Sequence, residues 1–157
     1  MNTILNHPVY KYHAQKNISA EEDWPYCKHD IIHLMDVARI AYILNLENNF
    51  GFAKELIYAA ALLHDITKWK QIIENIPHNE SAIEPTAEIL RDCDFDNNEI
   101  SLINRAILNH RDGPKDNDNF SYIIYKADKL SRPCFFCNYD KDTCDWDKSK
   151  KNLFLSY

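Results

Sequence analysis

An imidazole and a carboxylate stand side by side in this chain, at His64 and Asp65, directly after the apolar run Ala59–Leu63. A neutral imidazole nitrogen and a carboxylate oxygen together suit a divalent transition metal. Taken alone, such a pair is most simply a helix end with a solvated charge. A carboxylate this close to a buried run, however, is seldom buried unless it is paired or bound. The pair therefore predicts a metal site where a buried helix ends.

Two further residues complete a possible ligand set on either side of this pair. His33 comes earlier, four residues before Val37-Ala38, and Asp128 comes later, within Ala127-Asp128-Lys129-Leu130. In this order and context, the chain resembles the HD-domain metal-dependent phosphohydrolases over roughly residues 24–132. The resemblance implies that His33, His64, Asp65 and Asp128 bind one ion. His29 shares a helix face with His33 and is expected to support a ligand or to face the substrate.

Two more histidines, His78 and His110, fall between the pair and Asp128. Some HD-domain proteins bind a second metal through two such histidines, with the aspartate of the pair bridging the ions. In this respect the chain resembles the HD-type diadenosine tetraphosphate hydrolases, and more closely a group of small uncharacterised HD proteins. The alternative is that His78 and His110 line the pocket as a general acid or as phosphate contacts. Thr67 replaces the glycine usual in the family, so either the helix continues regularly or its hydroxyl meets the site.

The resemblance implies hydrolysis of a phosphoester, on a nucleotide or another small phosphorylated metabolite, with one or two divalent ions of Mn, Fe, Co, Mg, Ni or Zn. Such an ion activates water and polarises the phosphoryl group. Cations must then balance the phosphoryl oxygens. We expect Asp65, Lys68 and Arg111 to carry the catalysis, with Arg132 as a further cation unless it is merely a solvated surface residue. Two alternatives stay open, which are a di-iron oxygenase of the same fold and a non-catalytic nucleotide sensor.

Four of the five cysteines form a second pattern near the C-terminus and ahead of His33. Cys27 is six residues before His33 and Cys134 six residues after Asp128, followed by Cys137 and Cys144. If the helices that carry His33 and Asp128 run antiparallel, both cysteines emerge at the same end. A structural zinc site, or an iron–sulfur cluster, is then geometrically feasible. The alternative is a set of reduced cysteines that pack as small apolar residues. Cys93 lies outside this set.

Apolar residues recur at helical spacing through most of the chain, so the elements that position these residues should be helices. The periodicity predicts a helix over about residues 26–46, ended by Asn48-Asn49-Phe50-Gly51 with Gly51 as a stop residue. It predicts a second helix over 53–64, buried nearly all round. Further helices are expected over 79–92, with a kink or restart at Pro85, from the capping box Asp96/Glu99 to about 110, and over 120–130. Residues 1–20 should form a docking helix or arm, residues 68–77 are ambiguous, and residues 111–119 should form a loop. The expected fold is an all-α bundle of five to seven helices.

The composition narrows the function further. With 157 residues the chain is expected to form a single HD domain over 1–157, with a core at about 24–132 and a cysteine-containing tail at 133–157. Only two glycines occur, which favours helices over strands joined by tight turns. A net charge of −6 argues against general nucleic-acid binding. The absence of a long apolar run and of a signal-like N-terminus predicts a cytoplasmic protein without membrane partners. The expected partner is a small phosphorylated or nucleotide substrate, and the sequence is compatible with a homodimer.

Overall fold

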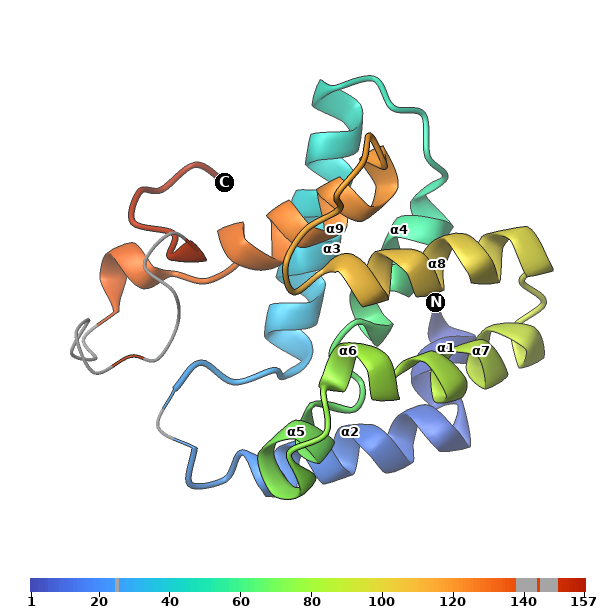
Figure 1. Ribbon diagram of the computed structural model, residues 1–157, viewed down its shortest axis with the longest axis vertical. Coiled ribbons are helices and arrows are strands. Elements are labelled where there is room, and N and C mark those ends of the chain that lie inside the picture. Colours follow the sequence, from blue (N-terminus) through green and yellow to red (C-terminus); the bar gives the residue numbers. More distant parts are fainter. Residues whose placement is uncertain (25, 138–143, 145–149) are drawn as a thin grey trace.

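The computed structural model describes residues 1–24, 26–137, 144 and 150–157, and the regular structure in these residues is helical, without strands (Figure 1). The all-α fold class predicted from the sequence is confirmed. Two of the nine described α-helices are only five and four residues long, so the longer ones agree with the expected five to seven. The α-helices are α1 (Asn2–Asn6), α2 (Pro8–Ala20), α3 (Ile31–Glu47), α4 (Lys54–Leu63), α5 (Lys68–Glu74), α6 (His78–Ser81), α7 (Ile83–Asp92), α8 (Asn97–Asn109) and α9 (Asn119–Leu130), followed by the 3-10 turn η1 (Cys134–Phe136).

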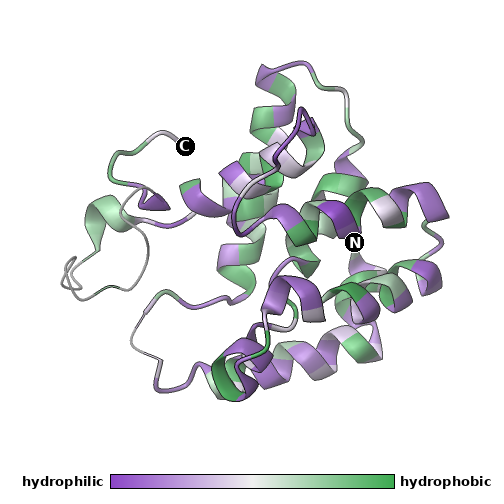
Figure 2. Cartoon of the chain, in the orientation of Figure 1, coloured by the Kyte–Doolittle hydropathy of each residue, from purple (hydrophilic) through white to green (hydrophobic). Residues whose placement is uncertain are grey.

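Helix α4 forms the centre of the bundle, as its sequence predicts. It packs against α3, α8 and α9, and hydrophobic colouring runs over it and over parts of the helices around it in Figure 2. Ile57, Leu62 and Leu63 are completely or almost completely buried. Burial of each such side chain contributes roughly 1.5–3 kcal/mol. The helix ends at Leu63, so His64 and Asp65 lie in a turn at the end of the best-packed element of the molecule.

Helices α3 and α9 run antiparallel, and this arrangement sets the position of the site. Where α3 begins and α9 ends, His33 Nε2 lies 3.4 Å from Asp128 Oδ1. Near the opposite ends, the rings of Phe52 and Phe120 are 5.0 Å apart. The site residues of both helices therefore lie at one end of the bundle.

The start of α3 differs from the prediction, whereas its end at Glu47 agrees with the expected end near residue 46. The helix begins after Asp30, whose carboxylate accepts hydrogen bonds from the backbone N–H groups of Ile32 and His33, and not at residue 26. An aspartate N-cap satisfies free N–H groups that the apolar periodicity cannot reveal. At the other end Asn49, with φ of 53°, takes the left-handed conformation that leaves the helix. Gly51 lies two residues further on, in the loop, so the prediction that it ends the helix is wrong.

The segment between α4 and α8 was the hardest to predict. Residues 68–74 form a regular helix, α5, which is ended by Asn75 in the left-handed conformation. The expected helix over 79–92 is divided at Ala82 into α6 and α7. Pro85 is the third residue of α7, a position that needs no donated N–H, so the proline restarts a helix and does not kink one. The capping box of Asp96 and Glu99 at the start of α8 is confirmed.

The N-terminal residues form a docking arm. Helix α2 packs against α5 and α7 (Figure 1), and Ile4 of α1 is completely buried in the hydrophobic core. None of the described helices is both long enough and apolar enough to cross a lipid bilayer. Much of the predicted tail, 138–143 and 145–149, lies outside the described residues.

Candidate metal centre

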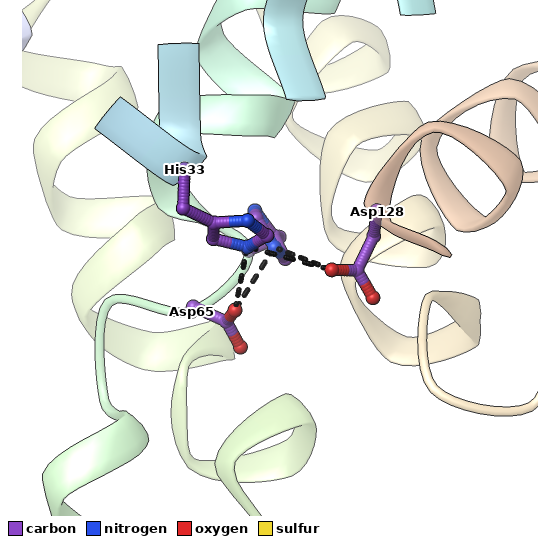
Figure 3. Close-up of side chains that lie close together, drawn as sticks. His33, Asp65 and Asp128 are labelled. Atoms are coloured by element: carbon purple, nitrogen blue, oxygen red, sulfur yellow. Dashed lines mark ion pairs between the residues drawn. The ribbon is translucent and has the colours of Figure 1, made fainter. Parts of the chain in front are cut away.

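His33, His64, Asp65 and Asp128 converge on one point between α3, the end of α4 and α9 (Figure 3). Their nearest ligand atoms all lie within 4.8 Å of one another, and all four side chains are buried. His33 Nε2 is 3.5 Å from Asp65 Oδ2 and 3.4 Å from Asp128 Oδ1. His64 Nε2 is 3.0 Å and 3.8 Å from the same two oxygens. Two imidazole nitrogens and two carboxylate oxygens thus face a common centre, which is a donor set for a divalent transition metal.

A second group shares Asp65 with the first. Asp65, His78 and His110 also offer ligand atoms within 4.8 Å of one another. His78 Nε2 lies 3.1 Å and His110 Nε2 3.6 Å from Asp65 Oδ1. The two carboxylate oxygens of Asp65 therefore face different partners, because Oδ2 faces His33 and His64, and Oδ1 faces His78 and His110. This is the arrangement that a carboxylate needs to bridge two ions.

Several of these buried donor atoms lack an ordinary partner, which is consistent with an ion as their missing partner. His64 Nε2 and Asp128 Oδ1 have no hydrogen bond within the described residues. Leaving such buried atoms unpaired costs about 1–3 kcal/mol each. His78 Nε2 and His110 Nε2 lie only 2.9 Å apart, so one ring must donate a proton to the other unless a cation lies between them. The residues present therefore fit one or two divalent cations.

The opposite ring nitrogen of each histidine is held by a neighbouring oxygen. These contacts fix the orientation of the rings and leave every Nε2 directed at the centre, as is usual for metal-binding histidines. The Nδ1 partners are Ser131 Oγ for His33 at 3.1 Å, Ala61 O for His64 at 2.7 Å, Gln71 Oε1 for His78 at 2.5 Å, and Ile107 O for His110 at 2.6 Å. Ser131 donates its own proton to Asp128 O, so its oxygen accepts from His33. Sequence reasoning missed Gln71 and Ser131, since only the fold brings them to their histidines.

The charges at the centre divide the histidines into two kinds. Burial alone would lower the pKa of His64, but the carboxylates of Asp65 and Asp128 outweigh it and raise the pKa to about 10. Burial lowers the pKa of His33 and of His78 to about 4. Burial opposes the ionised form of Asp65 and Asp128, yet His64 beside Asp65 and Lys129 beside Asp128 hold both pKa values well below the usual range. Both carboxylates are thus anionic and ready to bind a cation.

A cavity of about 350 Å³ opens onto this centre. Among its lining residues are the two cations that the sequence nominated, Lys68 and Arg111. Lys68 is half-buried at the start of α5, and Arg111 is exposed at the mouth of the cavity. From the sequence, Arg132 was at least as easily explained as a surface cation as by a role in the site. In the structure it is only 4% exposed, and its Nη2 lies 3.0 Å from His33 Nε2. Its environment excludes the surface interpretation.

Lys129 also lines the cavity and was not predicted. Its ammonium lies 2.6 Å from Asp128 Oδ2 and donates to His110 O at 3.1 Å. Asp128 Oδ2 is therefore used by Lys129, which leaves Oδ1 for the centre. Its position next to Asp128 in the sequence could have marked Lys129 as a site residue, but the sequence does not reveal that this lysine is buried.

His29 lies beside the centre without belonging to either ligand group. Its Nδ1 and backbone N–H both contact the buried carboxylate of Glu21. Its Nε2 lies 3.8 Å from Asp65 Oδ2, and its side chain lines the cavity. This position is compatible with either role expected from the sequence. Glu21 was not predicted, because it belongs to the N-terminal arm.

Thr67 and Asn17 hold the turn that carries Asp65. The Thr67 hydroxyl is completely buried and donates to His78 O at 2.9 Å, with Ser81 Oγ 2.8 Å away. The helix does not continue regularly through Thr67, so that alternative is wrong, and the hydroxyl reaches α6 and not the cavity. Asn17 of α2 donates to Asp65 O at 3.0 Å and accepts from the Trp69 N–H at 2.8 Å. The arm and α6 are thereby tied to the ligand turn.

The predicted cysteines lie apart from the two ligand groups. Cys27 is in the loop before α3, Cys134 and Cys137 lie in and just after η1, and Cys144 is among the described residues of the tail. None of these described cysteines is joined in a disulfide. Cys27 and Cys144 line the same cavity as the histidine–aspartate centre. Cys93 ends α7, away from this cavity.

Comparison with known proteins agrees with this geometry. The family model described as HD domain matches residues 30–132, which is more than half of the chain. A protein of Clostridium beijerinckii, described only as an uncharacterized protein, is 44% identical over 156 residues, covering 99% of this chain and 98% of that protein. The search of solved structures found no match.

Proposed function

Because the chain belongs to the HD-domain family, we propose that it is a metal-dependent phosphohydrolase that acts on a nucleotide or another small phosphoester. The observation that carries the proposal is that the two carboxylate oxygens of Asp65 face different pairs of histidines. Oδ2 faces His33 and His64, and Oδ1 faces His78 and His110. In this proposal His33, His64, Asp65 and Asp128 would hold one ion, and Asp65, His78 and His110 would hold a second. An ion held there lowers the pKa of a bound water and polarises a phosphoryl oxygen.

The lining of the cavity supports an anionic substrate. Lys68 faces the cavity, and within the described residues its ammonium forms no hydrogen bond or ion pair. It can therefore bind a phosphoryl oxygen without first breaking another contact. Arg111, exposed at the mouth, can bind a more distant phosphate or charged group of the substrate. Lys129 and Arg132 are held at Asp128 and His33, where they set the local charge.

The same features favour hydrolysis over the two alternatives. A centre that serves only oxygen activation has no need of cations directed at substrate phosphates. A sensor that only binds nucleotide has no need of a complete ligand set around a bridging carboxylate. The cationic lining and the ligand set are both explained if negative charge on a phosphoryl group is stabilised during reaction.

Replacement of Asp65 tests the proposal directly. Phosphate release is measured for purified Asp65→Ala and wild type against a panel of nucleotides and small phosphomonoesters, with each candidate divalent metal. Asp65→Ala should lose activity and bound metal while keeping its helical circular dichroism, because ligands are lost but the core is not. Asp36→Ala, at an aspartate paired with Arg39 on the outer face of α3, should match wild type. Wild-type turnover in Asp65→Ala would overturn the hydrolase mechanism, and iron-dependent oxygen consumption would favour the oxygenase.

A further inference from the structure

A second group of potential metal ligands lies at the end of the bundle where α3 begins and α9 ends. We propose that Cys27, Cys134, Cys137 and Cys144 form a zinc site that fastens the C-terminal segment to the loop before α3, beside the cavity. This inference is independent of the hydrolase proposal, since it concerns other residues and a different kind of site.

The antiparallel arrangement of α3 and α9 brings the two cysteine-bearing segments together. The close approach of His33 to Asp128 fixes the start of α3 beside the end of α9. Beyond these ends, Arg132 donates through Nη1 to Lys28 O at 2.9 Å. Cys27 directly precedes Lys28, and Cys134 follows Arg132 by two residues. The hydrogen bond therefore joins the two segments within a few residues of both cysteines.

Cys134 and Cys137 are spaced as a pair of zinc ligands usually is. They begin and end the turn at η1, in which the Cys137 N–H donates to Cys134 O at 3.4 Å. Two residues between cysteines on a tight turn is the spacing common in structural zinc sites, because both sulfurs can then reach one ion. Neither cysteine is buried in the hydrophobic core, so their packing does not explain the pair.

The four thiols also lie close enough to influence one another. Burial raises the pKa of the Cys27 thiol, Arg132 opposes that shift, and repulsion from Cys134, Cys137 and Cys144 raises the pKa further. Such repulsion requires proximity, because it weakens with distance. Cys27 and Cys144 in addition line the same cavity. Cys93 does not contribute to this repulsion, which separates it from the other four.

The four cysteines lie near one another without forming a closed site. Among the described residues, the groups with ligand atoms within 4.8 Å of one another are the two histidine–aspartate groups. The four sulfurs therefore lie further apart than in a closed site and would draw together on an ion. Zinc is the best-suited ion, since four cysteines that release their protons on binding form a closed tetrahedral site around it.

The proposed site would hold the C-terminal segment at the cavity. Lys150, six residues after Cys144, lines the cavity and donates to Arg111 O and to Asp112 Oδ1, each at 2.9 Å. Asn152 donates to Leu130 O at 2.8 Å, at the end of α9. These contacts close one side of the cavity mouth. A zinc ion at Cys144 would anchor the chain just before them.

Metal analysis of single cysteine variants tests the proposal. To remove the contribution of the histidine–aspartate centre, both variants are made in the full-length Asp65→Ala chain, expressed with zinc and desalted. Cys93→Ser, the matched control, should retain about one zinc ion per chain, and Cys134→Ser should lose it. Equal zinc content in the two variants would overturn the proposal. Failure of the hydrolase proposal would leave this result unchanged.

Cobalt titration of the wild-type chain gives a readout that does not depend on any variant folding. Cobalt bound by thiolates absorbs in the near ultraviolet through sulfur-to-metal charge transfer, and cobalt bound by histidine and carboxylate does not. That band should appear with about one equivalent of cobalt and disappear when zinc is added. No band at saturating cobalt would overturn the site. Iron with acid-labile sulfide in the purified protein would overturn its assignment to zinc.

Discussion

Asp65 has a different task for each of its polar groups. Oδ2 faces the first ligand group, Oδ1 faces the second, and its backbone oxygen accepts from Asn17 of the N-terminal arm. The Asp65 side chain is buried, and five imidazoles lie within 3.8 Å of its carboxylate. Burial opposes the charged form, but these rings, His64 foremost, hold its pKa well below the usual range. A residue held on three sides cannot adjust its position, so even the conservative Asp65→Glu change would displace both ligand groups.

Replacing Lys68 should slow the reaction while the protein keeps its bound metal. Lys68→Ala should lower kcat/KM by about 100-fold, the scale observed when one charge-stabilising donor is removed. Metal content should not change, because Lys68 contacts no ligand. Lys70→Ala is the matched control, since Lys70 lies over the Trp69 ring and does not line the cavity. Steady-state phosphate release and elemental analysis of both variants provide the comparison, and equal metal loss in Lys68→Ala would contradict the assigned role.

His110 should control the number of bound ions. If Asp65 bridges two ions, they lie about 3.5–4 Å apart, and His110→Ala should reduce the stoichiometry from about two to about one, with a fall in activity. Arg111→Ala, one residue further, should keep the stoichiometry and raise KM. Native mass spectrometry of the metal-loaded proteins measures both. One ion in the wild type, unchanged in His110→Ala, would reduce His78 and His110 to pocket residues.

At the scale of the elements, a helix or helix end could be predicted where neighbouring residues in the sequence carry the pattern that determines it. The periodicity of α4, the capping box of α8 and the restart at Pro85 are local patterns, and each predicted its element. The N-cap at Asp30 is not visible in the apolar periodicity, so the start of α3 was placed too early, while its end was predicted to within about one residue. The residues that converge at the candidate metal centre were predicted because their order and context resemble a family.

The burial of charged residues could not be predicted in the same way. Arg132 and Lys129 look like ordinary surface cations in the sequence. They are buried because the carboxylates of Asp128 and Asp65 compensate their charge, and that compensation exists only once α9 packs against α3 and α4. Ser131 and Gln71 are polar residues without periodicity, and only the fold brings them to their histidines.

The Thr67 hydroxyl should connect the ligand turn to α6. Thr67→Val keeps the shape but leaves His78 O and Ser81 Oγ without this partner, so we expect a loss of about 1–3 kcal/mol in the free energy of unfolding and weaker binding of the second ion. Thr86→Val is the matched control, because the buried Thr86 hydroxyl has no hydrogen-bond partner within the described residues. Urea denaturation and metal titration measure the two effects. Equal stability of the two variants would show that the Thr67 contacts do not hold α6.

For the molecule as a whole, the metal-free protein should become more stable as the pH rises from about 4 to about 6.5. The folded-state pKa of His33 and of His78 is about 4, whereas an unfolded histidine titrates near 6.5. Between these values the unfolded chain binds protons that the folded chain excludes, so unfolding is favoured as the pH falls. Each histidine contributes a slope of about 1.4 kcal/mol per pH unit.

Urea denaturation of chelator-treated protein at several pH values measures this slope. His78→Gln cannot titrate at that position and should reduce the slope by about 1.4 kcal/mol per pH unit. Lys54→Ala, at a lysine that lies over the Tyr42 and Tyr58 rings and away from the histidines, should leave the slope as it is in the wild type. A free energy of unfolding that stays constant across this pH range in the wild type would contradict the assigned histidine environments.

The position of Arg132 has a consequence for the order in which the protein is assembled. Its guanidinium donates to His33 Nε2 and lies 4.0 Å from Asp65 Oδ2 and 3.9 Å from Asp128 Oδ1, so a positive charge supplied by the chain already stands beside both carboxylates. Newly synthesised protein can therefore reach its native fold before any ion arrives at the histidine–aspartate centre. Folding and metal delivery there become separate events, unlike in a zinc finger, which is unfolded without its metal. Shortage of the ion would then leave a pool of intact, inactive molecules that can be loaded later.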